Sequence, residues 1–228
     1  MAPVSNLLAY SIAVPAFAAV IFMAVREHRI LRASRRNLLD RCLRVLDKDV
    51  LVHGADDFPR LTGVWRGYRA DVELIPDTMT IRRLPQLWMS VTCLAPVPCH
   101  GAFAALVRHS GYEFYGLTTH FEHGLEPPAG LPPEIVIRGE DAASQALLDA
   151  MRAPLCEIFS DPLVKEVDVT ANGVRIIRQA SEGRRGEHLL LRQAVFDDAQ
   201  VPASDLERIL LQLDDLRETI TQKGARAA

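Results

Sequence analysis

The stretch of sequence that decides the fold is KEVDVTANGVRIIRQ, residues 165–179. Two runs that contain Val or Ile, 165–170 and 174–179, flank the dipeptide Asn172-Gly173. Asn-Gly between two such runs is the strongest short-range signal for a hairpin, because the tight turns that join antiparallel strands require positive φ angles. The sequence therefore predicts two antiparallel strands here, joined by a short turn.

Further strands are expected on both sides of this hairpin, in segments rich in β-branched and aromatic residues. They are expected at residues 61–68, 71–76, 78–84, 87–94, 103–109, 134–138 and 188–196. Two main helices are expected, one at about 141–159, kinked or split by Pro154, and one at about 203–221. Strands in runs, with helices inserted late, indicate an α+β fold with a mostly antiparallel sheet.

The N-terminal segment is a second strong feature, because residues 1–25 contain no charged side chain. Within it, Leu7–Val25 is an apolar run that only Ser11 and Pro15 interrupt. A run of about 20 apolar residues is long enough to cross the hydrocarbon core of a bilayer. No Lys or Arg precedes the run, which argues against a cleavable signal peptide with its positive first region. We expect a transmembrane anchor over residues 1–25; a signal peptide and a buried soluble helix are the alternatives.

The positive charge that follows the apolar run predicts the orientation of this anchor. From Arg26 to Lys48 there are eight basic and three acidic residues, a net charge of +5. The positive-inside rule places this flank in the cytoplasm and the short N-terminus outside. Because Arg outnumbers Lys 23 to 3 and Ala is abundant, a GC-rich bacterial genome is suggested. The expected location is the bacterial inner membrane, crossed once.

The rest of the chain divides into a basic segment and an acidic body. Residues 26–48 are expected to form a helix that lies on lipid headgroups, pairs with a partner helix or packs on its own domain. From Asp49 onward, 18 basic and 26 acidic residues give a net charge of −8, which leaves no basic face for nucleic acid. We expect a linker over 49–60, one cytoplasmic domain over 61–222 and a frayed tail over 223–228.

Arginines in two places are candidates for contact with anionic groups. In the basic segment, the candidates for lipid headgroups are Arg26, Arg29, Arg32, Arg35 and Arg36. The second place is the pair Arg184 and Arg185, which Gly183 and Gly186 flank in an expected turn. Such a loop can bind phosphate oxygens through bidentate contacts, and solvated charges at a hairpin tip are the alternative.

Signals for catalysis are weak. The densest group of metal-capable side chains is His120, Glu122, His123 and Glu126, but a zinc site normally shows three or four clear ligands and the pattern fixes no third one. Cys93 falls in an expected apolar strand, where a free cysteine packs as a small hydrophobe. No phosphate-binding loop, dinucleotide fingerprint or HExxH motif occurs. We therefore expect no catalytic residue, no metal site and no cofactor.

The aromatic residues of the β-rich half have two interpretations. They are Trp65, Tyr68, Trp88, Tyr112, Phe114 and Tyr115. They either pack in the core and sheet or form a surface patch for a partner, since aromatic side chains dominate interface energetics.

The sequence as a whole favours a non-enzymatic interaction, accessory or assembly subunit of a larger membrane complex. Such a subunit contacts lipid through its anchor and binds an integral membrane protein as its partner. A headgroup-binding domain is the alternative, and a metal-dependent enzyme around His120 and His123 is less favoured.

Overall fold

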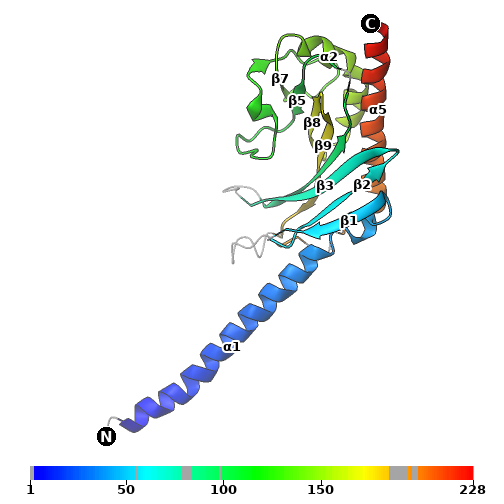
Figure 1. The fold of residues 1–228 in the computed structure, drawn as a ribbon. Helices are drawn as coiled ribbons and strands as arrows, with labels where there is room; N and C mark the ends of the chain where they lie inside the picture. The colour runs from blue at the N-terminus through cyan, green and yellow to red at the C-terminus, as the bar shows by residue number, and fades with distance from the viewer. Residues whose placement is uncertain are drawn as a thin grey trace.

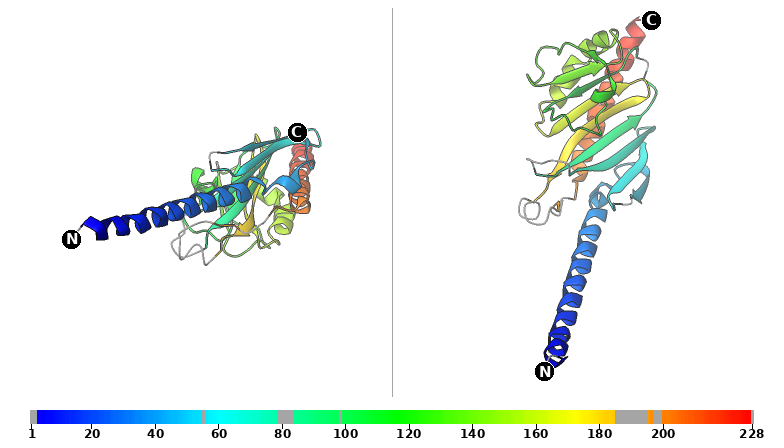
Figure 2. Two further views of the ribbon diagram at one scale, coloured as in Figure 1. Left: turned by 90° about the horizontal axis from the view of Figure 1, so that it is seen from below. Right: turned by 90° about the vertical axis from the view of Figure 1, so that its left-hand side faces the viewer.

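The fold is α+β, with a long N-terminal helix projecting from one end of a body built on a large sheet (Figure 1). The computed structural model describes residues 3–54, 56–78, 84–97, 99–184, 195–196 and 200–227, with side chains from residue 13 to residue 222 within these ranges. The N-terminus and the C-terminus lie at opposite ends of the molecule (Figures 1 and 2).

The sheet contains nine strands within the described part of the chain, and each pairing is antiparallel. The strands are β1 (Asp47–His53), β2 (Pro59–Trp65), β3 (Tyr68–Asp77), β4 (Gln86–Leu94), β5 (Phe103–Leu106), β6 (His123–Gly124), β7 (Val136–Gly139), β8 (Val164–Thr170) and β9 (Gly173–Glu182). Their order across the sheet is β1-β2-β3-β4-β9-β8-β5-β7-β6. The mostly antiparallel α+β fold expected from the sequence is thus confirmed.

The expected hairpin joins β8 to β9 in the sheet, where Thr170 pairs with Gly173 across the turn. Gly173 has a φ of 152° and packs against the neighbouring strand β4. A Cβ atom at this position would lie 2.2 Å from the carbonyl oxygen of Cys93. The turn therefore needs glycine for its φ angle and for the close approach of two backbones.

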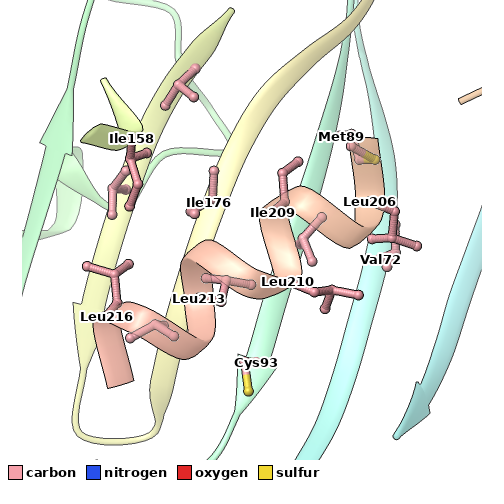
Figure 3. Packing of buried hydrophobic residues seen from close by; sticks show 14 of the residues in the cluster. Val72, Met89, Cys93, Ile158, Ile176, Leu206, Ile209, Leu210, Leu213 and Leu216 are labelled. Carbon is pink, nitrogen blue, oxygen red and sulfur yellow. The ribbon is translucent and has the colours of Figure 1, made fainter. Parts of the chain in front are cut away.

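Helix α5 (Ala203–Ala227) covers one face of the sheet, together with the short helices α2 (Ser144–Ala150) and α3 (Arg152–Ile158) (Figures 1 and 3). Buried residues recur on α5 at three- and four-residue spacing: Leu206, Ile209, Leu210, Leu213, Leu216 and Ile220. They pack in one core with sheet residues that include Val72, Met89, Cys93 and Ile176 (Figure 3). Met151 separates α2 from α3, which confirms the expected split near Pro154; the proline sits in the first turn of α3, where its missing N–H costs no helical hydrogen bond.

The segment after residue 36 differs from its expected structure. Helix α1 (Pro3–Arg36) ends before Asn37, so the helix expected over residues 26–48 is too long. A short 3₁₀ turn, η1 (Asp40–Cys42), follows, and strand β1 then occupies much of the expected linker 49–60. The charged residues at the start of β1 are not typical of a strand, so the sequence did not predict it. In the fold, pairing with β2 stabilises the strand.

Helix α1 leads away from the body, and its described side chains from Ala13 to Ile30 are exposed (Figure 2). Among the residues that the structure describes, no helix is long and apolar enough to cross a membrane, so this part of the expected fold is not confirmed. The strand expected at 188–196 lies mostly outside the described residues, as do residues 79–83 of the strand expected at 78–84.

Candidate functional site: an aromatic loop fixed by buried charges

Residues 108–121, which follow β5 and include the 3₁₀ turn η2 (Thr118–His120), form a segment that we name the aromatic loop. Tyr112 and Phe114 are 67% and 63% exposed, whereas Glu113 between them is buried and Tyr115 after them is half-buried. The chain therefore turns alternate side chains outward and inward. Two large exposed aromatic side chains two residues apart in one loop are typical of a protein-binding surface.

Glu113 fixes the tip of the aromatic loop by accepting hydrogen bonds from four donors. Its Oε1 accepts from the Ser110 backbone N–H at 2.7 Å, from Ser110 Oγ at 2.6 Å and from Lys165 Nζ at 2.9 Å, and its Oε2 accepts from the Gly111 N–H at 3.0 Å. Burial alone would raise the pKa of Glu113, but the hydrogen bonds from Ser110 and Lys165 outweigh it and lower this pKa to about 2. The carboxylate is therefore ionised at neutral pH.

Lys165 reaches the loop because it lies at an irregularity of β8, where the register against β9 shifts between Val164 and Glu166. Its ammonium group also donates to the Arg108 carbonyl at 2.7 Å and lies 5.8 Å from the centre of the Trp88 ring. The side chains of Lys165 and Glu113 are only 3% and 2% exposed. Removing Lys165 would leave the Glu113 carboxylate buried without this counter-ion.

Glu166 makes a second attachment between β8 and the aromatic loop. Its Oε1 accepts from the Thr118 backbone N–H at 3.1 Å and from Thr118 Oγ1 at 2.7 Å. The loop passes so close to this carboxylate that a Cβ atom at Gly116 would lie 2.9 Å from Glu166 Oε2. Buried carboxylates thus hold the loop at both its tip and its end.

Asp168 continues this row of buried charges, because residues two apart in a strand share a face of the sheet. Its Oδ2 accepts from Arg175 Nε on β9 at 2.5 Å, and Arg175 Nη2 lies 3.8 Å from Glu166 Oε2. Four buried side-chain atoms in this region have no hydrogen-bond partner within the described residues: Trp88 Nε1, Glu166 Oε2, Asp168 Oδ1 and Arg175 Nη2. Burial, followed by the charge of Glu166, raises the pKa of Asp168 to about 8. The arrangement therefore favours a protonated Asp168 at neutral pH.

The raised pKa of Asp168 predicts a pH-dependent stability. Because the folded state holds this proton more tightly than the unfolded chain does, the stabilisation is complete below the ordinary carboxyl pKa of about 4 and is lost as the pH rises through about 8. The substitution Asp168→Asn should therefore flatten the decline of the urea midpoint between pH 5 and pH 9, measured as the difference from wild type. Parallel pH profiles for the two proteins would contradict this assignment.

The arginines expected at lipid headgroups divide into two groups. Arg32 and Arg36 form ion pairs with the carboxylate of Asp57, and Arg35 places its guanidinium 5.1 Å from the centre of the Phe58 ring. These three arginines therefore contact the turn before β2 and fix the end of α1 on the body. Arg26 and Arg29 are exposed on the part of α1 that extends away from the body.

Asp57 is expected to control how firmly α1 is held on the body. Its carboxylate is buried, and hydrogen bonds, first from Arg36 and then from Arg32, lower its pKa. The junction should therefore be fully stabilised above the ordinary carboxyl pKa of about 4 and weaken as the pH falls through the lower folded value. We expect Asp57→Asn to speed tryptic cleavage after Arg35 and Arg36 at neutral pH, with Asp40→Asn, an exposed position, as the control.

The remaining candidate residues from the sequence are not brought together into a site within the described residues. Arg184 is exposed and its backbone N–H donates to the Val195 carbonyl at 3.0 Å, while Arg185 lies outside the described residues. His120 and His123 are exposed, and the described part of the chain contains no group of three or more side chains placed to hold a metal ion.

Sequence reasoning missed Glu113, Lys165, Glu166 and Asp168. One signal was present, because the strand expected at 165–170 contains three charged residues among valines. Charges in a strand that is buried on both faces need partners, and the partners come from the aromatic loop and β9.

Comparisons with known proteins leave the family of this chain open. No protein-family model matches the chain, and no curated protein matches it. Among solved structures, the crystal structure of the mycobacterial trehalose monomycolate transport factor A, TtfA, is similar with a TM-score of 0.38 and 9% sequence identity. The match covers 71% of this chain and 72% of that chain. So distant a similarity does not extend to activity or partners.

Proposed function

We propose that this protein is a membrane-tethered, non-enzymatic accessory subunit whose body binds an integral membrane protein. Residues 1–25 enter the bacterial inner membrane once, with the N-terminus outside and the body in the cytoplasm. The aromatic loop is one contact surface of the body. No catalytic step is assigned to the buried charges, since their contacts account for the position of the loop.

The observation that carries the proposal is the exposed apolar surface of α1. Large apolar side chains on the described part of this helix are about half or more exposed: Val14, Phe17, Val20, Ile21, Phe22, Met23 and Val25. Leaving such surface in water is unfavourable by about 25 cal/mol for each Å². The uncharged run extends from Met1 to Val25. A bilayer matches the chemistry of this surface, and the net charge of +5 after it suits the cytoplasmic side.

The aromatic loop supports the binding of a protein partner. Tyr112 and Phe114 present apolar area with few rotatable bonds, and the buried contacts of Glu113 hold the backbone beneath them in one conformation. A surface that is ordered before binding loses less conformational entropy when it binds. The pair is therefore suited to act as an anchor for a partner.

Membrane attachment is tested by fractionating cells that produce the full chain with a C-terminal tag. We expect the protein to stay in the membrane pellet after alkaline carbonate washing and its tag to resist protease in intact spheroplasts. Introducing two charges with Phe17→Arg and Ile21→Arg should move it to the supernatant, since each costs about 3 kcal/mol at the centre of a spanning helix. Val50→Arg, at an exposed valine of β1, is the matched control. Release of the wild-type protein by carbonate would overturn the attachment.

The accessory role is tested by purifying the tagged protein from native membranes in mild detergent and identifying what accompanies it. We expect an integral membrane protein in a fixed ratio, lost with Tyr112→Ala and Phe114→Ala and kept with Leu94→Ala, an exposed leucine at the end of β4. A protein that purifies alone from wild-type membranes would count decisively against a subunit.

A second candidate function, recognition of anionic headgroups, is favoured by the exposure of Arg26 and Arg29 next to the apolar run. Each Lys or Arg near an anionic surface contributes about 1 kcal/mol. Stronger association with anionic than with zwitterionic vesicles, lost with Arg26→Ala and Arg29→Ala, would support this role. Equal association with both vesicles would exclude it.

A further inference from the structure

A groove runs between α3 and α5 on the side of α5 that faces away from the sheet, and its volume is about 560 Å³. Helix α5 lines it with residues at helical spacing: Ser204, Glu207, Arg208, Leu211, Gln212 and Asp215. Helix α3 supplies Pro154, Glu157 and Ile158. We name it the α3–α5 groove. It is distinct from the aromatic loop, because none of its lining residues belongs to that loop.

The middle of the α3–α5 groove is apolar. Pro154 and Ile158 are buried on the α3 side. On α5, Leu211 is 47% exposed, although the leucines on either side of it in sequence, Leu210 and Leu213, are fully buried. A leucine exposed between two helices offers the kind of contact that an amphipathic helix makes through residues at i, i+3 and i+4.

The rim of the α3–α5 groove is acidic. Glu157, Glu207 and Asp215 are exposed along it. The basic lining residue, Arg208, donates hydrogen bonds to Asp161 Oδ2 at 3.1 Å and to Asp205 Oδ1 at 2.9 Å. Its charge is therefore balanced by its own neighbours, and the groove presents net negative charge to a partner.

We infer that the α3–α5 groove binds a basic amphipathic helix in a cytoplasmic segment of the partner membrane protein. Aliphatic side chains of that helix contact Leu211, and its Lys and Arg side chains face Glu157, Glu207 and Asp215. This inference rests on the proposed function, because cytoplasmic segments of inner-membrane proteins carry an excess of Lys and Arg. The acidic rim and the apolar middle of the groove are therefore complementary to a basic amphipathic segment of this partner.

The test uses the full chain in zwitterionic nanodiscs and a fluorescent peptide of about 18 residues, or five helical turns, with Leu on one face and Lys on the other. Fluorescence anisotropy measures binding, and empty nanodiscs supply the background. We expect binding that weakens with salt and falls on the order of tenfold or more with Glu207→Lys and Asp215→Lys. Glu218→Lys, an exposed acid on α5 outside the groove, is the matched control and should change affinity less than twofold.

Three results would overturn the inference. A peptide of scrambled sequence that binds equally well would show attraction by charge alone. An equal loss of affinity with Glu218→Lys would show that the groove is not the site. Self-association of the protein that Leu211→Ala abolishes would identify a second copy of the chain as the occupant.

The peptide measurement is independent of the cell fractionation. If the peptide binds but the protein leaves the membrane pellet, the proposed membrane attachment is wrong and the inference about the groove is supported. If the protein stays in the membrane and purifies with its partner but the peptide does not bind, the inference about the groove fails.

Discussion

Replacing Lys165 with Ala should destabilise the body by about 3–5 kcal/mol, because it leaves the Glu113 carboxylate buried without its counter-ion. Both side chains are almost fully buried, and the Lys165 ammonium also holds the Arg108 carbonyl at the start of the aromatic loop. Urea unfolding of the full chain in mild detergent measures the change. The loss should be accompanied by faster proteolysis within the aromatic loop, since its tip is fixed through Glu113.

Two further variants separate this buried pair from ordinary surface charges. The double variant Lys165→Ala with Glu113→Ala should cost less than the sum of its two single variants, because no charge is left unpaired. Arg60→Ala breaks an ion pair with Asp71 in which the arginine is half-exposed, and it should cost no more than about 1 kcal/mol. Equal costs for Lys165→Ala and Arg60→Ala would refute the role assigned to the buried pair.

Replacing Leu213 with Ala should cost about 2–5 kcal/mol, the range for a large buried side chain whose removal leaves a cavity. Leu213 is fully buried in the core between α5 and the sheet (Figure 3). Leu211→Ala is a matched control two residues away on the same helix, and its cost should be within about 0.5 kcal/mol because the side chain is exposed. The two variants therefore separate stability from binding. Leu213→Ala should lower the stability of the body, whereas Leu211→Ala should weaken only the binding of the peptide to the α3–α5 groove. A comparable loss of stability from both would contradict the packing of α5.

The elements that the sequence predicted correctly are those whose signals are local. The Asn172-Gly173 turn, the apolar stripe of α5 and the break near Pro154 each depend on residues within a few positions of one another. Strand β1 escaped prediction because its first three residues are charged, although its partner β2 is the next strand along the chain. The local pattern there resembles a linker, and only pairing makes it a strand.

The candidate site was harder to predict than the fold. The sequence showed that Tyr112 and Phe114 belong to an aromatic group, but an irregular segment has no period that assigns side chains to the inside or the outside. The partner of Glu113 is Lys165, 52 residues away, and that pairing follows from the irregularity in β8. Similarly, Asp57 pairs with Arg32 and Arg36 across 25 and 21 residues of sequence, and no local pattern indicates these ion pairs.

The order of the strands also determines when this body can be completed during synthesis. Strands β1 to β4 are neighbours in sequence and in space, but the next strand across the sheet is β9. Gln86 at the start of β4 contacts Glu182 at the end of β9, 96 residues later. At a translation rate of about 5–20 residues per second, the open edge of β4 waits on the order of 5–20 s for its partner. During that interval the nascent chain presents an unpaired strand edge, which is a hazard for aggregation.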